Sequence, residues 1–320
     1  MTADIEIESV TDYSTTLARD GDILLLREHR NWNSDDYGHV LISNDQAGFL
    51  NAYYAYPAGY YNRHLAAANL NRYVFGFDII PSLSLIAVSN WVYGLRLVKY
   101  NARDYHTWWR EGLHIVKRKS VQSIEAEIES TDVTDFRDVR VFDDQSGNIY
   151  LYCVDVYYGL IVLQVDISTY DMTVVAHHKY DHPDWPTGTA SGSSTTKFPY
   201  SRTWECELSN DNNYLYVTAV EGIFLVYDIT NKTNPILLSE TTLGVINSTS
   251  GKRATNVYAP AVDIGNNDLV YIPSNSGLYI LDVSDPSDVV LIGSLPLYGS
   301  GVGTDREFTA KTIIPKKKRT

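Results

Sequence analysis

The chain has 320 residues, which is enough for two average domains or for one large all-β domain or barrel. It carries 26 Lys and Arg against 39 Asp and Glu, a formal net charge of −13. This balance disfavours a general nucleic-acid binder and a protein held on anionic lipid, because both need clustered basic residues. The two cysteines are too few for a disulfide framework or a four-cysteine zinc site, and no apolar run approaches the ~18 residues of a membrane span.

The N-terminal segment 1–34 predicts little regular structure. Its one strand-like stretch lies within 16–30, so we expect the segment to contribute a strand to the first or to the closing unit of the fold. The opening residues are polar and acidic, unlike a signal peptide. We therefore expect either a protein that is not secreted or a piece of a longer chain.

Residues 35–320 are dominated by a repeat of short strands. Each copy has an apolar strand, a turn of four to five residues that ends in Gly, and a second apolar strand. The turn glycines are Gly48, Gly94, Gly159, Gly222 and Gly277. Gly is favoured at the turn exit because it adopts positive φ without strain.

One more strand is predicted before each of these hairpins and another after it. The preceding strands are expected at 72–80, 136–144, 202–210, 255–263 and, for an unfinished copy, 306–315. The following strands are expected at 105–113, 172–180, 235–243 and 289–297, and the segment 121–130 is expected to be a short linker or another strand. Four antiparallel strands per repeat is the number found in a propeller blade.

The later copies resemble a known family. Residues 277–293 have the sequence Gly-Leu-Tyr-Ile-Leu-Asp-Val-Ser-Asp-Pro-Ser-Asp-Val-Val-Leu-Ile-Gly, and the copies at 222–239 and 159–168 share its Asp-x-Ser/Thr step. This pattern resembles the LVIVD repeat, which typically has the form Gly-Leu-x-Ile-x-Asp-Ile-Ser-x-Pro-x-x-Pro. The resemblance covers about 135–300, whereas the copies within 35–130 keep only the Gly. It implies a β-propeller, commonly in extracellular or cell-surface proteins, with no shared catalytic function.

The predicted fold is therefore an all-β propeller of four-stranded antiparallel blades. Five Gly-centred hairpins and the final strand 306–315 favour a ring of five or six blades, closed by pairing of that strand with the N-terminal strands. The alternative is a truncated piece of a longer array. Within each late copy, Asp166, Asp228 and Asp282 precede a Ser or Thr by two residues, and we expect them to cap turns as structural residues.

The pattern that best suggests a binding site is a recurrent arginine at the beginning of the predicted innermost strands. The four residues are Arg72, Arg137, Arg202 and Arg306. In a propeller such positions would ring one mouth of the central channel, where like charges repel unless they are paired or ligated. Either each arginine bonds a carboxylate or carbonyl of a neighbouring blade, or the four bind an anionic ligand. They are our candidate ligand-binding residues.

Other chemistry is less well supported. His177, His178 and the acidic residues that follow are metal-ligand types, but adjacent strand residues point to opposite faces, so we predict no metal site. There is no G-x-S-x-G, H-E-x-x-H or P-loop motif, and we predict no catalytic residue and no cofactor. The aromatic clusters at 51–64 and 105–112 suit protein or sugar contacts, or packing between blades.

These features predict a non-enzymatic binding or scaffolding module that presents loops and a channel mouth to a protein, glycan or anionic ligand, alone or as part of a larger cell-surface protein. No nucleic-acid partner and no membrane insertion are expected. The alternative is a glycosidase- or lactonase-like propeller hydrolase, which would place two carboxylates ~5–10 Å apart at the channel mouth. A cytoplasmic interaction platform is the third hypothesis, because no signal peptide is evident.

Overall fold

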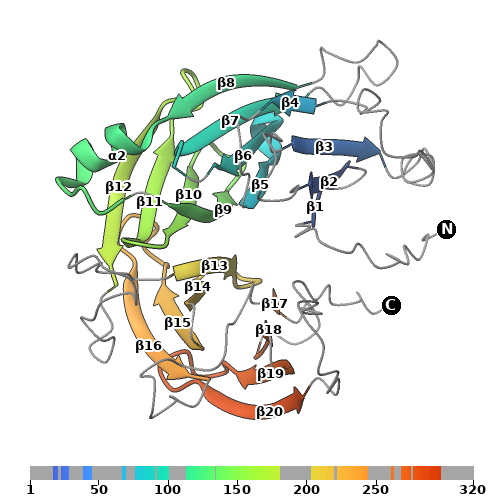
Figure 1. Ribbon diagram of the computed structural model, residues 1–320, viewed down its shortest axis with the longest axis vertical. Coiled ribbons are helices and arrows are strands. Elements are labelled where there is room, and N and C mark those ends of the chain that lie inside the picture. Colours follow the sequence, from blue (N-terminus) through green and yellow to red (C-terminus); the bar gives the residue numbers. More distant parts are fainter. Residues whose placement is uncertain are drawn as a thin grey trace, which may run out of the picture.

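The computed structural model describes residues 17–20, 23–28, 39–44, 67–69, 76–90, 92–100, 113–133, 135–180, 203–219, 222–243, 261–262, 268–274 and 277–296, with side chains for most of these from residue 76 onward. These residues form five four-stranded antiparallel sheets, each built from four strands that are consecutive in the sequence. Figure 1 shows the sheets following one another around a common axis.

The strands of the first two sheets come from the N-terminal third of the chain. The first sheet contains β1 (Leu17–Asp20), β2 (Ile23–Glu28), β3 (His39–Asn44) and β4 (Ala67–Asn69). The second contains β5 (Gly76–Ile80), β6 (Leu85–Ser89), β7 (Leu95–Tyr100) and β8 (Leu113–Lys119). A short 3-10 turn, η2 (Pro81–Leu83), joins β5 to β6, and the helix α2 (Val121–Ile128) follows β8.

The remaining three sheets repeat the same order. The third contains β9 (Phe136–Asp143), β10 (Ile149–Asp155), β11 (Gly159–Val165) and β12 (Met172–Lys179). The fourth contains β13 (Thr203–Leu208), β14 (Tyr214–Ala219), β15 (Ile223–Asp228) and β16 (Ile236–Thr242). The fifth contains β17 (Ala261–Val262), β18 (Leu269–Ser274), β19 (Gly277–Asp282) and β20 (Val290–Pro296).

The first strand of each sheet lies nearest the axis. The inner strands contact one another in sequence order, β1 with β5, β5 with β9, β9 with β13 and β13 with β17. The fourth strands, such as β8, β12, β16 and β20, form the outer rim (Figure 1). This is the arrangement of propeller blades, and it confirms the predicted four-stranded repeat in the part of the chain that the structure describes.

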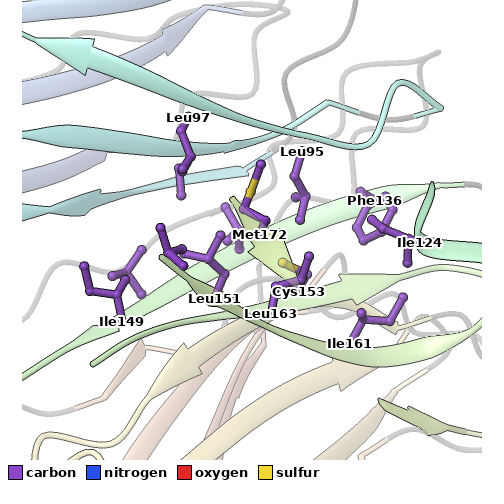
Figure 2. Close-up of a cluster of buried hydrophobic side chains, with 14 of the residues drawn as sticks. Leu95, Leu97, Ile124, Phe136, Ile149, Leu151, Cys153, Ile161, Leu163 and Met172 are labelled. Atoms are coloured by element: carbon purple, nitrogen blue, oxygen red, sulfur yellow. The ribbon is translucent and has the colours of Figure 1, made fainter. Parts of the chain in front are cut away.

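Apolar side chains fill the space between successive sheets. Strand β10 shows the pattern: Leu151 and Cys153 pack toward the second sheet, whereas Tyr152 and Val154 pack toward the fourth. Figure 2 shows the first of these clusters, which joins the second and third sheets. A sheet that is buried on both faces needs nearly continuous apolar strands, because alternation would place polar groups in one of the two interfaces. Each fully buried side chain of this kind contributes about 1.5–3 kcal/mol.

The predicted turns after the third strands are confirmed. The Asp166 carboxylate accepts hydrogen bonds from the backbone N–H and hydroxyl of Ser168. Asp228 accepts the same pair of bonds from Thr230. Asp282 accepts the N–H of Ser284. These acceptors satisfy N–H groups that the strand ladder leaves free, so the three aspartates are structural residues of the turns.

Two expectations for the second sheet are wrong. Its outer strand is Leu113–Lys119 and not 105–113, and residues 121–128 form a helix and not a linker or strand. An outer strand tolerates the basic residues of 113–119 because it faces water, and such charges protect a sheet edge. The helix begins at Ser120, whose hydroxyl accepts the Ser123 N–H, and it buries Val121, Ile124 and Ile128 along one face.

The first sheet also differs from its expected form. Strands β2 and β3 pair from Ile23 opposite Asn44 to Glu28 opposite His39. The segment 16–30 therefore supplies two strands of this sheet, β1 and β2, where the sequence predicts one. Gly48 and the final strand 306–315 lie outside the described residues. The division of the chain at residue 34 stays a prediction.

The turn glycines Gly94 and Gly159 end the hairpins that join the middle strands of their sheets, and they have φ of +83° and +120°. A β-carbon on Gly94 would lie 2.1 Å from the carbonyl oxygen of Lys119. A β-carbon on Gly159 would lie 2.6 Å from the carbonyl oxygen of His178. Backbone conformation and space thus both require Gly at these positions.

We expect Gly159→Ala to destabilise the fold by about 2 kcal/mol or more, because Ala adds strain at positive φ and a clash with backbone. Gly293→Ala is the matched control, because its added β-carbon would meet only Ile280, at 3.7 Å. The free energies of unfolding in urea measure both. Equal, small decreases in the free energy of unfolding for the two variants would contradict this account of the hairpin.

Candidate functional site

Arg137, the one predicted site residue that the structure describes, lies near the beginning of the inner strand β9. Its Nη2 donates to Asp135 Oδ2 at 2.7 Å, and its guanidinium carbon lies 4.1 Å from the centroid of the Trp204 ring. The Arg137 side chain is 11% exposed. The carboxylate partner therefore comes from the same blade, two residues before Arg137, and not from a neighbouring blade as expected. Arg72, Arg202 and Arg306 lie outside the described residues, and their role as ligand-binding residues stays a prediction.

The segment that carries Asp135 is held by a buried carboxylate in the neighbouring turn. Asp155 Oδ2 accepts the Asp135 N–H at 2.6 Å, and Asp155 Oδ1 accepts the N–H groups of Tyr157 and Tyr158. Thr203 Oγ1, at the start of β13, donates to the Asp155 carbonyl at 2.7 Å. We call Asp135, Arg137, Asp155, Thr203 and Trp204 the mouth cluster. It links the beginnings of two inner strands to the turn between β10 and β11.

Burial, together with the nearby carboxylate of Asp135, raises the pKa of Asp155 to about 7, although the three backbone N–H groups oppose the shift. The carboxyl group therefore takes up a proton near neutral pH while the fold is intact. The folded state binds more protons than the unfolded chain between the ordinary pKa of an aspartate and pH 7, so the stability that this group contributes falls as pH rises through that window.

Exposed apolar side chains lie at the same end of the second sheet. The turn Asn90–Gly94 corresponds to the turn Asp155–Gly159, since both join the middle strands of their sheets. Val92 and Tyr93 are 40% and 43% exposed there. Ser89, which precedes the turn, donates its hydroxyl to the carbonyls of Gly76 and Arg137. The mouth cluster and this turn thus belong to one face, formed where the inner strands begin.

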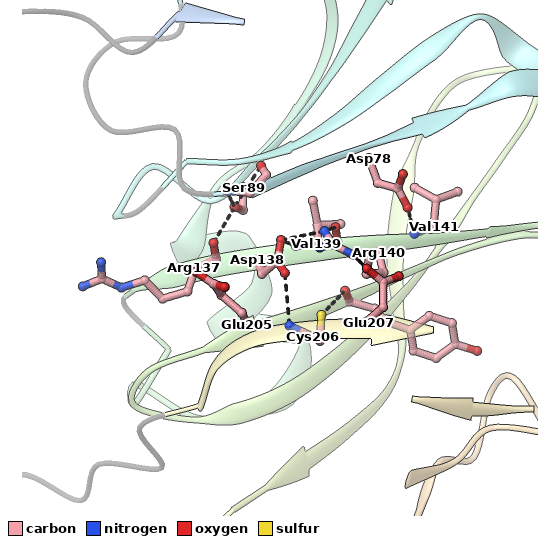
Figure 3. A network of polar contacts seen from close by, with 12 residues as sticks. Asp78, Ser89, Arg137, Asp138, Val139, Arg140, Val141, Glu205, Cys206 and Glu207 are labelled. Atoms are coloured by element: carbon pink, nitrogen blue, oxygen red, sulfur yellow. Dashed lines mark hydrogen bonds and ion pairs between the residues drawn. The ribbon is translucent and has the colours of Figure 1, made fainter. Parts of the chain in front are cut away.

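A second group of charged residues lies deeper along the inner strands (Figure 3). We call Asp78, Asp138, Arg140 and Glu207 the inner-strand network. Asp78 Oδ2, on β5, accepts the Val141 N–H of β9 at 2.8 Å. Asp138 Oδ2, on β9, accepts the Cys206 N–H of β13 at 3.0 Å. Each aspartate therefore joins one sheet to the next.

Arg140 balances this charge. It donates to Asp138 Oδ1 at 2.9 Å and to Glu207 Oε2 at 3.1 Å, so it also joins β9 to β13. Burial raises the pKa of Asp78 to about 6 and raises that of Asp138, with Arg140 opposing both shifts. The carboxylates of Asp138 and Glu207 in turn raise the pKa of Arg140 well above its usual range, although burial opposes this. Because burial is the largest contribution, Asp78 and Asp138 hold protons more tightly than exposed aspartates do, and Arg140 offsets only part of that effect.

Sequence reasoning did not single out this network. The sequence does contain a pattern that could have indicated it: charged residues interrupt the apolar inner strands. Asp78 lies between Phe77 and Ile79, and Asp138 and Arg140 lie on either side of Val139. Gly76 belongs to the same arrangement, because a β-carbon there would lie 2.1 Å from Asp138 Oδ1. A glycine beside a buried carboxylate from another sheet is a contact that no local pattern can predict.

The adjacent histidines of β12 contact different tyrosines. His177 Nδ1 lies 2.6 Å from the Tyr158 hydroxyl, and His178 Nδ1 lies 3.3 Å from the Tyr227 hydroxyl, so the two rings contact different partners. Within the described ranges, no group of three or more His, Cys, Asp or Glu side chains could hold a metal ion. No helix there is long and apolar enough to cross a membrane.

The family comparison agrees with the repeats. The LVIVD repeat model matches residues 206–242 and 263–296, which span most of the fourth and fifth sheets. This chain carries LVIVD repeats. No curated protein matches the sequence significantly. The propeller relationship therefore rests on the repeat model and on solved structures.

Several solved structures share the fold of this chain. The periplasmic gluconolactonase PpgL of Pseudomonas aeruginosa superimposes with a TM-score of 0.60 and 11% identity, over 90% of this chain and 72% of that one. The β-propeller domain of Cps50 (Swd1) from Myceliophteria thermophila gives 0.51 and 14%, over 88% and 72%. A chain of the COPII outer coat on membranes gives 0.51 and 10%, over 90% and 64%. At these identities the similarity shows the fold alone.

We expect Arg140→Met to cost about 3–5 kcal/mol, because it leaves the buried carboxylate of Asp138 without its cation. Lys179→Met is the matched control: its ion pair with Asp132 is about one-third exposed on both sides. Such a surface pair contributes about 0–1 kcal/mol. Urea unfolding of both variants measures the difference. If Arg140→Met lowers the free energy of unfolding as little as the control does, the network is not an important link between sheets.

We expect Asp155→Asn to remove part of the pH dependence of stability. In the wild type, the free energy of unfolding should fall by up to about 1.4 kcal/mol per pH unit as pH rises toward 7, because the folded state holds the Asp155 proton. Asn cannot titrate, so the variant should keep only the slope due to the other buried carboxyls, such as Asp78 with its pKa of about 6 and Asp138. Asp166→Asn is the control, because the pKa of that exposed carboxyl is about 2. Unfolding curves from pH 5 to 8 measure the three slopes, and identical slopes for Asp155→Asn and wild type would contradict the assignment.

Proposed function

We propose that the chain is a non-enzymatic binding or scaffolding module, a ring of five or six blades that presents its mouth face to a protein, glycan or anionic ligand outside the cell or at its surface. The observation that carries the proposal is that the charged side chains of the mouth cluster have hydrogen-bond partners within the chain. Arg137 is paired with Asp135 and stacked on Trp204, and Val92 and Tyr93 are exposed in the turn of the second sheet on the same face. Satisfied charges with exposed aromatic and aliphatic groups suit a recognition surface.

The inner carboxylates support the same choice. Asp78 uses both oxygens to accept backbone N–H groups, and Asp138 uses both for N–H groups and Arg140. Asp143 and Asp144, an adjacent acidic pair, accept backbone N–H groups of Ser82 and of the turn that follows β9. A hydrolase needs a carboxylate that is available to substrate or water. These carboxylates are committed to holding the fold together.

A second candidate function is lactone hydrolysis at the channel mouth. The observation in its favour is the shared fold with a protein described as a periplasmic gluconolactonase. Asp155 would be the strongest candidate for an acid or base among the described residues, because its pKa of about 7 suits proton transfer at neutral pH. Against this, its two oxygens accept three backbone N–H groups, and the residue is fully buried.

The two functions make different predictions. Screening on a glycan array and against a phage-displayed peptide library should identify a ligand. The substitutions Val92→Ser and Arg137→Ala should each lower the affinity for that ligand about tenfold or more. Ile167→Ser is the matched control, because Ile167 is 50% exposed at the opposite end of the third sheet, in the turn after β11. Equal affinity for all variants would contradict the proposed face. Hydrolysis of glucono-1,5-lactone above the uncatalysed rate, lost in Asp155→Asn, would instead support the hydrolase.

A further inference from the structure

A buried arginine in the second sheet plays no part in the mouth cluster or in the inner-strand network. Arg96, on β7, is only 4% exposed, and neither its Nε nor its Nη1 has a hydrogen-bond partner among the described residues. Buried guanidinium donors without acceptors cost several kcal/mol of desolvation free energy. Something with acceptor oxygens is therefore needed beside this side chain.

A second arginine lies next to it on the same face. Arg96 pairs directly with Arg118 of β8, and cross-strand partners project from the same side of a sheet. Arg118 is exposed, and neither arginine forms an ion pair with any residue that the structure describes. Burial and, to a smaller extent, the charge of Arg118 lower the pKa of Arg96 to about 10. Two like charges opposite each other are destabilising unless an anion lies between them.

The location suits access from solvent. Leu95 and Leu97, which flank Arg96 on β7, belong to the cluster between the second and third sheets, so Arg96 projects from the opposite face, toward the first sheet. Tyr93, 43% exposed, is close enough to act on the Arg96 charge. Arg118 and Tyr93 are exposed, whereas Arg96, opposite Arg118 on the neighbouring strand, is buried.

We propose that Arg96 and Arg118 form an oxyanion-binding site, with Tyr93 at its rim. The ligand class is a phosphate or carboxylate group, because the planar guanidinium presents paired N–H donors that match two oxygens of such a group. The exposed arginine captures the anion, and the buried one binds it with little competition from water. The site shares Tyr93 with the proposed binding face but no residue with the mouth cluster, and its test changes only Arg96 and Arg118.

The test uses the full chain with inorganic phosphate and with acetate as probes, at constant ionic strength adjusted with sodium chloride. Calorimetric titration and thermal unfolding should show binding of at least one probe and a rise in Tm with its concentration. Arg96→Leu and Arg118→Gln should weaken that binding about ten- to a hundredfold, the effect of losing one charge-assisted hydrogen bond. Lys99→Gln is the matched control, because Lys99 is an exposed cation on the same strand.

The stability of Arg96→Leu without either probe is a second readout. If the site is built for a ligand, the variant should unfold at the same or a higher temperature, because an uncompensated buried charge has been removed. Strong destabilisation would mean that a carboxylate of this chain already pairs with Arg96, and it would overturn the proposal. Absence of binding by both probes, or equal weakening by Lys99→Gln, would also overturn it. Ligand binding at the mouth cluster would be unaffected by any of these results.

Discussion

The inner strands are edge strands, and their free backbone donors constrain the rest of the structure. Each inner strand pairs with only one neighbour in its own sheet, so about half of its N–H groups have no partner in a backbone ladder. Among the described strands, no backbone ladder joins one sheet to the next. Asp78 and Asp138 meet this need by accepting an N–H of the following inner strand. A carboxylate is a strong acceptor, and in a buried setting such a bond also specifies register, because a shift by one residue would leave a charge without its donor.

The apolar clusters and the carboxylate links have complementary roles. The clusters between sheets supply most of the free energy of burial, but they are tolerant of small displacements. The hydrogen bonds of the carboxylates are directional, and they set the position of each inner strand relative to the next one. Arg140 extends this control by joining Asp138 on one strand to Glu207 on the next. The beginnings of the inner strands are thereby held together, which places Arg137, Trp204 and the turn Asp155–Gly159 on one face.

Within this repeated frame, equivalent turns have diverged. The turn Asn90–Gly94 exposes Val92 and Tyr93, whereas the corresponding turn Asp155–Gly159 buries Tyr158 and uses Asp155 to hold the neighbouring segment. The local backbone is similar, since both turns end in a Gly with positive φ. The side chains of the two turns have different roles. The turn Asn90–Gly94 contributes exposed contact area, and the turn Asp155–Gly159 contributes rigidity. A binding face on a repeat protein needs both, because exposed groups recognise a ligand only where the frame holds them in place.

Periodicity alone determined much of this protein. The Gly-ended hairpins, the Asp-x-Ser/Thr turns and the nearly continuous apolar middle strands are local patterns, and they correctly predicted the hairpins that end at Gly94, Gly159, Gly222 and Gly277. Arg137 was recognised in the same way, through its recurrence at strand starts. The outer strand β8 and the helix α2 were missed, because a basic edge strand and a short amphipathic helix carry weak local signals.

The tertiary structure decided which charges meet. The links from Asp78 to Val141 and from Asp138 to Cys206 join residues more than 60 positions apart. The isolation of Arg96 beside Arg118 and the burial that raises the pKa of Asp155 are likewise properties of packed sheets. A sequence pattern records what each strand prefers by itself. Electrostatic partners and desolvation depend on what lies across the interface, and only the folded chain determines that.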